Sequence, residues 1–219
     1  MTTLPTPAPE DPLPVVSTWL AEVTASGRLK NPNAMALATS DRAGAPSVRM
    51  VLLKEIAPPG YAVFYSNYQS RKGTELDENP RAAAVLYWEP LGRQVRFEGP
   101  VVRSPATESD AYFATRPTLS QVNAWSSAQS RPLEAPEDLD RAAARAAREL
   151  GIASDRSTAP RRVPRPEYWG GYRLWFDTLE LWAEGANRFH ERLRYRRDLE
   201  RADAFAYRAS EWRAQRLQP

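Results

Sequence analysis

The sequence predicts an α+β fold, an antiparallel and closed or nearly closed β-barrel with flanking helices. Its 219 residues are 42% hydrophobic and 26% charged, which is ordinary composition for a globular protein. Five short β-rich runs precede residue 104, and most are joined by short turn-forming links. Helical sequence then follows up to about residue 150, before further β-rich runs close the chain.

The N-terminal part predicts an arm and one helix. Residues 1–14 contain five prolines and few apolar side chains, so they predict a flexible arm ahead of a single domain over residues 15–219. Val15, Trp19, Leu20 and Val23 then follow helical spacing. Gly27 marks the helix C-terminus.

The five β-rich runs and one short helix predict the first part of the barrel. Residues 34–39 and 47–56 form a hairpin around Asp41 and Gly44. The third strand reads YAVFYSN, and the helix after it reads SRKGTELDENP. The fourth and fifth strands, RAAAVLYWE and RQVRFEGPVVRS, pair around Gly92.

The second half predicts three helices, a loop and the closing strands. The helices read TESDAYFATRP, LSQVNAWSSAQS and EDLDRAAARAAREL, and residues 153–166 lack periodicity, which predicts a surface loop. A strand pair, GGYRLWFDTLELWAEG with RFHERLRYRRD, and a last strand, EWRAQRLQP, close the barrel.

The composition excludes several kinds of chemistry. With no cysteine and one histidine, the chain has no disulfide, thiolate metal site or multi-histidine metal site, and redox chemistry requires a borrowed cofactor. A net charge of +3 is weak support for nucleic-acid binding. No apolar run approaches the roughly 20 residues that span a bilayer, and no leader is visible, which predicts a cytoplasmic protein without a membrane partner.

Two of the three lysines stand out among many arginines. The lysines are Lys30, Lys54 and Lys72. An ammonium is a compact point charge that a guanidinium does not replace at a tight site, so Lys54 and Lys72 are candidates for binding an anion. The alternative is that both positions carry lysine by chance, in a chain whose composition otherwise favours arginine.

Three segments carry groups suited to a phosphorylated aromatic ligand. The strand RMVLLK, residues 49–54, has a cation at each end and apolar residues between them. Arg71 and Lys72 begin a helix, where backbone N–H groups and two cations suit a phosphate. Tyr112, Arg116 and Ser120 recur every four residues and share one face if helical, although a solvated helix face explains the same pattern.

A fourth segment contains the histidine. In NRFHERLRY, Arg188, His190 and Arg192 alternate with other residues, so on a strand they line one side. A single histidine is more often structural than catalytic, which leaves both interpretations open.

Taken together, these motifs resemble one enzyme family. RMVLLK, FYSNYQSRKGTELDENPRAA, RQVRFEG, YFATRP, RPEYWGGYR and RFHERLRY occur in the order and spacing of the pyridoxamine 5′-phosphate oxidase family, over about residues 15–197. The resemblance implies an FMN-binding split β-barrel and a homodimer with flavin between the subunits.

The resemblance also implies the site residues. The family's FMN contacts fall on Arg49, Met50, Val51, Leu52, Leu53, Lys54, Tyr65, Ser66, Arg71, Lys72, Gln94, Gln129, Ser130, Trp182 and Arg192. Its substrate contacts fall on Lys54, Tyr112, Arg116, Ser120, Arg188, Phe189 and His190. Arg188 and His190 are the implied catalytic pair.

The implied reaction oxidises pyridoxamine or pyridoxine 5′-phosphate to pyridoxal 5′-phosphate, with O2 as the electron acceptor and H2O2 as a product. Other functions remain open: a related flavin oxidase that acts on a dihydrophenazine carboxylate, a non-catalytic flavin or pyridoxal-phosphate binding module, and a basic nucleic-acid binder. The sequence departs from the family in its arm, which lacks the Arg and Tyr that often lie over the substrate, and at Asn123, where glycine is usual. Residues 199–207 lengthen the last hairpin.

Overall fold

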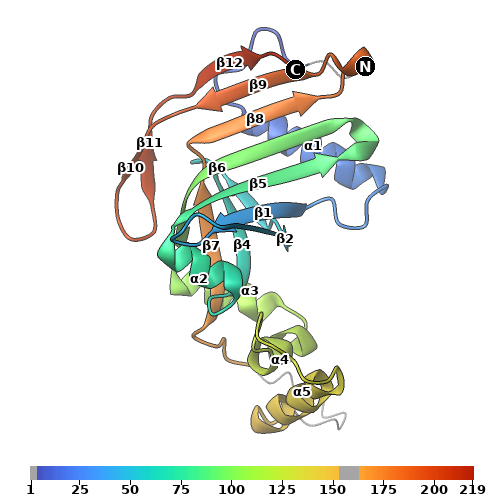
Figure 1. The fold of residues 1–219 in the computed structure, drawn as a ribbon, viewed down its shortest axis with the longest axis vertical. Coiled ribbons are helices and arrows are strands. Elements are labelled where there is room, and N and C mark those ends of the chain that lie inside the picture. Colours follow the sequence, from blue (N-terminus) through green and yellow to red (C-terminus); the bar gives the residue numbers. More distant parts are fainter. Residues whose placement is uncertain (1–3, 153–162) are drawn as a thin grey trace. The chain divides into compact units, whose positions relative to one another are not determined.

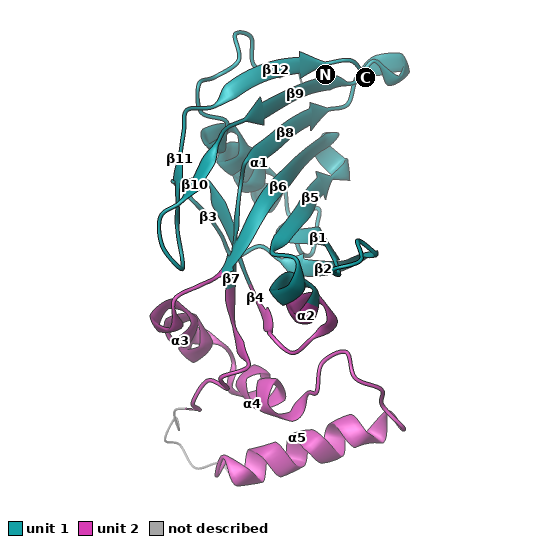
Figure 2. Cartoon of the chain, turned by 60° about the vertical axis from the view of Figure 1, so that its left-hand side comes forward, with its two compact units in different colours: residues 1–64, 75–102, 172–219 teal, residues 65–74, 103–171 magenta. Residues whose placement is uncertain are grey.

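The computed structural model describes residues 4–152 and 163–219 and confirms the α+β class. The chain forms two compact units, coloured separately in Figure 2. Unit 1 comprises Met1–Phe64, Glu75–Val102 and Tyr172–Pro219, and unit 2 comprises Tyr65–Thr74 and Arg103–Gly171. Within the described ranges, no helix is long and apolar enough to cross a membrane.

The main sheet has ten strands, and seven of them run in the order β12-β9-β8-β6-β5-β1-β2 (Figure 1). Their bounds are β1 Ala34–Ser40, β2 Pro46–Leu52, β5 Arg81–Trp88, β6 Arg93–Arg103, β8 Thr178–Ala183, β9 Glu191–Arg196 and β12 Arg213–Leu217. Off this path, β4 (Tyr61–Asn67) pairs with β3 (Glu55–Ala57) and with β7 (Trp169–Trp175), which also pairs with β6. A separate hairpin is formed by β10 (Leu199–Arg201) and β11 (Tyr207–Ala209).

The core of unit 1 lies on one face of this sheet. Leu86, Val95, Leu181 and Leu193 are successive partners across β5, β6, β8 and β9, and each is at most 1% exposed. Alternation along each strand therefore turns the neighbouring residues to the opposite face.

Helix α1 (Leu13–Ser26) covers part of the core of unit 1. Trp19 is 5% exposed, and the Arg93 guanidinium at the start of β6 stacks over its ring at 4.9 Å. Gly27 ends the helix in the left-handed conformation and donates its N–H to the Thr24 carbonyl. The predicted helix and its stop are confirmed.

The prediction of one strand over residues 47–56 is wrong, because the chain changes partners in the middle. The Leu53 N–H bonds to the Asn33 carbonyl, whereas the Lys54 N–H bonds to the Val63 carbonyl on β4. The chain therefore leaves the β1 ladder at Leu52 and enters the β4 ladder as β3, so Lys54 lies at a corner of the sheet. The segment GGYRLWFDTLELWAEG likewise divides into two strands, β7 and β8.

Unit 2 contains the three predicted helices, α3 (Ala106–Thr115), α4 (Thr118–Ser126) and α5 (Glu137–Glu149), and the first turn of α2 (Arg71–Glu78). Phe113, Ala124, Val163 and Trp169 form its buried cluster. Helix α4 ends earlier than predicted, because Ser127 is extended, and this leaves Gln129 and Ser130 in a loop. Most of the predicted surface loop, residues 153–162, lies outside the described residues.

Candidate functional site

The structure places two expected cofactor residues of unit 2, Ser66 and Gln129, around a third, Lys72. This side chain is 7% exposed, and its Nζ donates to Ser66 Oγ at 3.0 Å and to Gln129 Oε1 at 3.1 Å. Ser70 Oγ accepts a third bond at 3.1 Å. These three side-chain oxygens accept from the ammonium and hold it in place.

The local sequence explains how Lys72 reaches this position. The Asn67 side chain accepts the Gln69 N–H at 2.7 Å, which turns the chain from β4 into α2. Gly73 allows the first turn to approach the strand, because a Cβ there would lie 1.9 Å from the Tyr68 carbonyl oxygen. The adjacent Arg71 is exposed, so the two neighbouring cations differ in environment.

Gln129 and Ser130 belong to the loop between α4 and α5. Ser130 has a left-handed backbone, with φ of 70°. Both residues line a cavity of about 540 Å³. Three arginines, Arg131, Arg141 and Arg145, line the same cavity, and Arg141 forms an ion pair with Asp138. The surroundings of the loop are therefore rich in cations.

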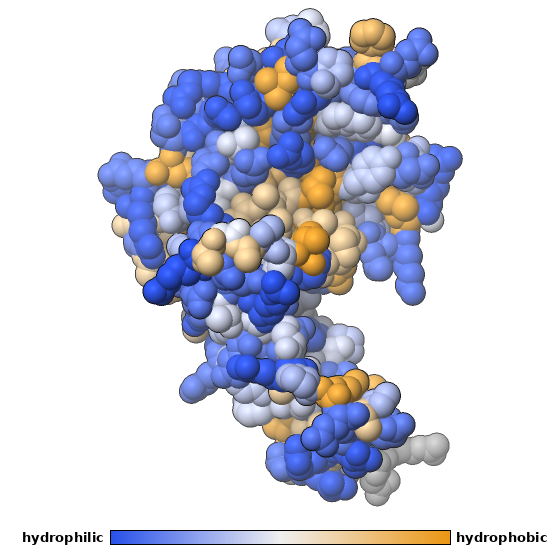
Figure 3. Space-filling view, in the orientation of Figure 1, coloured by the Kyte–Doolittle hydropathy of each residue, from blue (hydrophilic) through white to orange (hydrophobic). Residues whose placement is uncertain are grey.

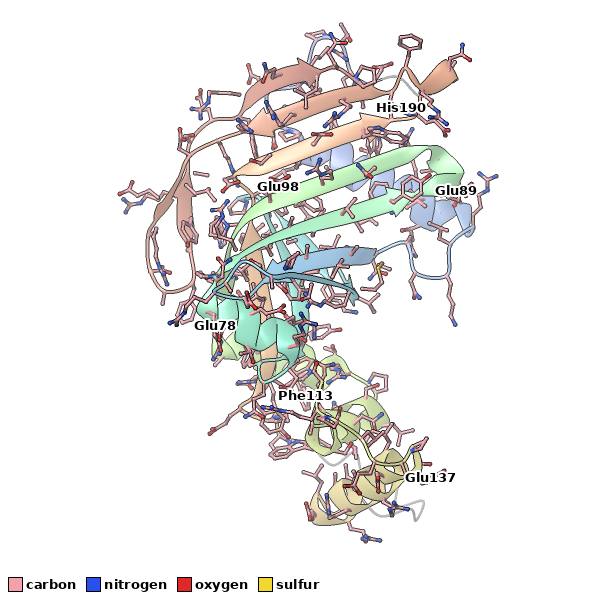
Figure 4. The ribbon with its side chains drawn as sticks, viewed as in Figure 1. Glu78, Glu89, Glu98, Phe113, Glu137 and His190 are labelled. Carbon is pink, nitrogen blue, oxygen red and sulfur yellow. The ribbon has the colours of Figure 1, made fainter. Side chains whose placement is uncertain are left out.

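A second group in unit 2 combines aromatic rings with a half-buried arginine. The Tyr65 ring stacks on Tyr112 with 3.9 Å between centroids and lies 5.5 Å from Trp169. The Arg116 guanidinium lies over the Trp169 ring at 4.5 Å and near the Phe113 ring, 5.4 Å from its centroid. Figure 4 labels Phe113 on α3.

Arg116 is the most unusual cation in this group. Its Nη1 is buried and has no hydrogen-bond partner. Desolvation by burial lowers the pKa of Arg116, and the nearby Tyr112 partly opposes this effect. A buried donor without a partner is costly unless a ligand supplies the acceptor, so this guanidinium is suited to binding an anion.

Tyr112, Arg116 and Ser120 do not lie on one helix, so the shared face that they would form if helical is absent. Helix α3 ends at Thr115, Arg116 is extended with φ −73° and ψ 147°, and Ser120 lies on the next helix, α4. The cause is Pro117, because a proline disfavours the helical conformation at the residue before it. The break sets Arg116 apart from the regular turns of either helix.

In unit 1, the side chains of the expected cofactor segment, residues 49–54, point to both faces of the sheet. Met50 and Leu52 lie on one face and are 63% and 41% exposed. Val51 lies on the other face and pairs with Met35 on β1. Leu53, directly after β2, is 3% exposed. Lys54 follows at the sheet corner with an exposed side chain.

Arg49 points to the inner side and is held by a buried carboxylate. Its Nη2 lies 3.1 Å from Glu75 Oε2, and Glu75 is 4% exposed. Thr39 and Ser47 accept further bonds from the Arg49 guanidinium. Glu75 therefore fixes the direction of this expected cofactor residue.

Three other expected residues form a row across the outer face of unit 1. Gln94 on β6 is the partner of Trp182 on β8, and Trp182 is the partner of Arg192 on β9. Cross-strand partners project to the same face, so the three side chains are neighbours.

Glu180 supports this row and was missed by sequence reasoning. It is 5% exposed and accepts two bonds from Arg192, from Nε at 2.8 Å and from Nη2 at 3.1 Å. The hydrogen bonds that Arg192 donates to Glu180 raise the pKa of Arg192. The signal in the sequence was a lone carboxylate in TLELW, two residues before Trp182 and hence on the same face.

Arg188 and His190 do not lie on a strand, which corrects the predicted alternation. Asn187 and Arg188 both have a left-handed backbone, with φ of 53° and 66°, and β9 begins only at Glu191. Such conformations cost of order 1–3 kcal/mol each in non-glycine residues and are often found at functional sites. Gly185 is required in this turn, because a Cβ there would lie 1.8 Å from the Phe189 carbonyl oxygen.

The turn orients the histidine ring. His190 directly precedes the first residue of β9 (Figure 4). Its ring centroid lies 4.7 Å from that of Trp182. The Gly185 N–H donates to His190 Nδ1 at 3.3 Å, which assigns the proton of the neutral ring to Nε2. His190 therefore presents its Nε2–H as a donor. Arg188 and Phe189 are exposed beside it. In the described ranges, no group of three or more His, Asp or Glu side chains is arranged to hold a metal ion.

Comparison with known proteins gives the family. Residues 23–150 match the family described as pyridoxamine 5′-phosphate oxidase, and residues 169–219 match the pyridoxine 5′-phosphate oxidase C-terminal dimerisation region. A pyridoxine/pyridoxamine 5′-phosphate oxidase of Rubrobacter xylanophilus is 45% identical over 97% of this chain and 88% of its own length. The enzyme of the same name from Salinibacter ruber is 43% identical over 96% of this chain and 90% of its own length.

Two solved structures show the same fold. PhzG from Burkholderia lata, in complex with tetrahydrophenazine-1-carboxylic acid, superposes with a TM-score of 0.82 at 32% identity and covers 100% of this chain and 98% of its own. A pyridoxamine 5′-phosphate oxidase-related, FMN-binding protein from Nostoc punctiforme gives 0.68 at 13% identity, covering 95% of this chain and 98% of its own. The expected split-barrel fold is thus confirmed, and the chain belongs to the pyridoxamine 5′-phosphate oxidase family of FMN-dependent oxidoreductases.

Proposed function

We propose that this protein oxidises pyridoxamine or pyridoxine 5′-phosphate to pyridoxal 5′-phosphate, with FMN as cofactor, O2 as electron acceptor and H2O2 as product. The observation that carries the substrate class is Arg116, whose Nη1 is buried beside aromatic rings without a hydrogen-bond partner. A phosphate ester supplies the acceptor that this donor lacks. The relatives with 45% and 43% identity bear the name of this activity.

The residues present also fit FMN. Lys72 is nearly buried, and Ser66 and Gln129 hold its ammonium, which suits a cation that binds a phosphate. Gln94, Trp182 and Arg192 form a row of polar and aromatic groups on the outer face of unit 1. We assign Arg71, Lys72, Ser66, Gln129 and Ser130 to the cofactor from unit 2. From unit 1 we assign Arg49 to Lys54, Gln94, Trp182 and Arg192 to the cofactor. Tyr65, in unit 2, completes the set.

The side chains of this protein bind and orient the substrate in the proposed reaction. Lys54, Tyr112, Arg116 and Ser120 bind the substrate phosphate, and Arg188, Phe189 and His190 lie over its ring. Arg188 orients the C4′ substituent, and the Nε2–H of His190 donates a hydrogen bond to it. The chemistry that FMN supplies when bound is acceptance of the hydride equivalent and its transfer to O2.

A second candidate is a flavin oxidase acting on a dihydrophenazine carboxylate. The specific observation in its favour is the PhzG structure, which covers the whole chain with a TM-score of 0.82. Its 32% identity is lower than the 45% of the Rubrobacter oxidase. An aerobic assay that follows peroxide with each substrate, and aldehyde as well with pyridoxamine 5′-phosphate, decides between the two candidates.

The proposal includes a homodimer. Val48, Met50, Leu52 and Tyr87 are 41% to 68% exposed on β2 and β5, and Figure 3 shows apolar residues gathered on this face of unit 1. An exposed apolar sheet face of this kind is typical of a protein interface. The match of residues 169–219 to a dimerisation region supports the same assembly.

The first prediction concerns the phosphate of FMN. Lys72→Ala removes a charge-assisted contact worth about 1.5–3 kcal/mol, so the Kd for FMN rises roughly 10- to 150-fold. Flavin fluorescence titration measures this change. Lys30→Ala, which removes an exposed lysine, is the control and should bind FMN normally. Wild-type affinity in a folded Lys72→Ala protein would place the FMN phosphate elsewhere.

The second prediction concerns the substrate phosphate. Arg116→Ala raises KM for pyridoxamine 5′-phosphate by roughly 10- to 100-fold and leaves flavin content unchanged, because the guanidinium binds substrate rather than cofactor. Arg148→Ala, at an exposed position on α5, is the control. Equal turnover of pyridoxamine and its phosphate by the wild-type enzyme would contradict the role of Arg116 and favour the carboxylate substrate.

The third prediction separates the catalytic pair. Arg188→Ala lowers kcat and raises KM, because this side chain orients the substrate as the C–H bond breaks. His190→Asn retains FMN and measurable turnover, since the ring donates a hydrogen bond that water can partly replace. Rapid-reaction measurement of flavin bleaching gives the reduction rate directly. If Arg188→Ala reduces flavin at the wild-type rate at saturating substrate, Arg188 is not catalytic.

The fourth prediction concerns Glu180. Glu180→Gln removes the charge that holds Arg192, so the Kd for FMN rises about 3- to 30-fold and the melting temperature falls. Asp198→Asn is the control, because Asp198 pairs with Arg213 at 2.9 Å in unit 1 but is exposed and has no ion pair to Arg192 among the described residues. An equal change in both variants would show that Glu180 has no special role in holding Arg192.

A further inference from the structure

The first described residues are fastened to the end of the sheet in unit 1. The Leu4 N–H donates to Glu191 Oε2 at 3.0 Å, and the Leu4 side chain is 3% exposed. Arg216 Nη2 donates to the Pro5 carbonyl at 2.8 Å and to Thr6 Oγ1 at 2.6 Å. Its Nη1 lies 3.4 Å from Glu191 Oε2, so one carboxylate and one guanidinium hold three consecutive residues.

The two side chains that hold the arm are neighbours of the proposed site. Glu191 directly follows His190 and is the first residue of β9. Leu217, next to Arg216, is the strand partner of Arg192, and the Gln218 carbonyl accepts a bond from Arg192 Nη1 at 3.2 Å. Figure 1 shows β12 beside β9 at this edge of the sheet. Residues 4–6 are thus tied to the beginning of β9, where His190 and Arg192 lie, and to the adjacent end of β12.

We propose that Glu191 and Arg216 are positioning residues, which clamp residues 4–6 and thereby hold the turn at residues 186–190 and the Arg192 side chain in place. An exposed ion pair alone contributes little, but here both partners also bond to the arm, and the Leu4 side chain is buried at the same point. The left-handed backbone of Asn187 and Arg188 makes the turn dependent on such support.

The catalytic consequence rests on the proposed function, because it assumes that Arg188 and His190 act on the substrate. In this proposal, residues 4–6 affect catalysis by holding the turn at residues 186–190 in place rather than by covering the substrate. A misplacement of about 1 Å at a reacting group can cost up to 10²-fold in rate, so loss of the clamp should be visible in kcat.

The test uses the FMN-loaded full-length protein with Arg216→Gln, Arg216→Lys and a deletion of residues 2–6. Arg216→Gln should lower kcat about 3- to 30-fold with a smaller change in KM, and it should speed hydrogen exchange in residues 4–12 and 186–192. Arg216→Lys should recover part of both effects, because an ammonium can pair with Glu191 but cannot match the fork of bonds to the arm. The deletion combined with Arg216→Gln should be no worse than either change alone.

Arg213→Gln is the matched control. Arg213 lies on the same strand and pairs with Asp198 at 2.9 Å, with its side chain 64% exposed. The clamp is overturned if Arg216→Gln leaves kcat and exchange at residues 186–192 unchanged, or if Arg213→Gln causes the same losses. Exchange does not depend on turnover. A wild-type protein that lacks oxidase activity would therefore refute the proposed function, while coupled exchange of the arm and the turn would still support the clamp.

Discussion

The register of β6, β8 and β9 is the constraint on which both the core and the proposed site of unit 1 depend. Val95, Leu181 and Leu193 are partners on the buried face, and Gln94, Trp182 and Arg192 are partners on the outer face. Because side chains alternate, a slip of one residue would expose the leucines and bury the arginine. The energy that drives core packing therefore also aligns the outer row, and no separate interaction is needed to set its spacing.

Buried polar groups add the directions that strand register cannot give. Glu180 fixes Arg192 through two bonds, and Glu75 fixes Arg49. Each carboxylate is nearly buried, which strengthens its hydrogen bonds but makes removal of either partner costly. Arg116 differs, because its Nη1 is buried without a partner. A free energy cost of this kind in the unliganded protein is expected where a ligand supplies the missing acceptor, and it is a common trade-off between stability and function.

Regular elements were predictable from sequence because their patterns are local. Apolar spacing and Gly27 located α1, and alternation located β1, β4, β5 and β6. The errors arose where the backbone departs from a regular period. Pro117 separates Arg116 from the helix of Tyr112, and the left-handed turn at Asn187 and Arg188 interrupts the strand expected there. Periodicity assumes that a segment is regular throughout, so it fails at such breaks.

Long-range partners were beyond the reach of the sequence pattern. Glu180 lies in an otherwise apolar strand, and only pairing of β8 with β9 brings Arg192 beside it. Leu4 and Glu191 are 187 positions apart, and no composition rule links an N-terminal proline-rich segment to a particular carboxylate. The resemblance to a family supplied the identities of the expected contacts, but not the groups that orient them. These orienting groups became visible only with the three-dimensional structure.

Whether the substrate is a phosphate ester or a carboxylate depends on the donors and charges of the substrate site rather than on the fold. The fold is shared with PhzG and the sequence is closer to the named pyridoxine/pyridoxamine 5′-phosphate oxidases, so likeness alone favours the phosphate ester without explaining it. A phosphate group offers three acceptor oxygens, whereas a carboxylate offers two. In our proposal Arg116, Tyr112 and Ser120 all donate to one anion, together with Lys54. A carboxylate can accept from as many donors, since its two oxygens have about four lone-pair sites, but its single charge balances the two cations Arg116 and Lys54 less well than a phosphate monoester of roughly −1.5 to −2 does. The break at Pro117 matters for this reason, since it frees Arg116 from helical geometry and leaves its guanidinium with a donor to offer.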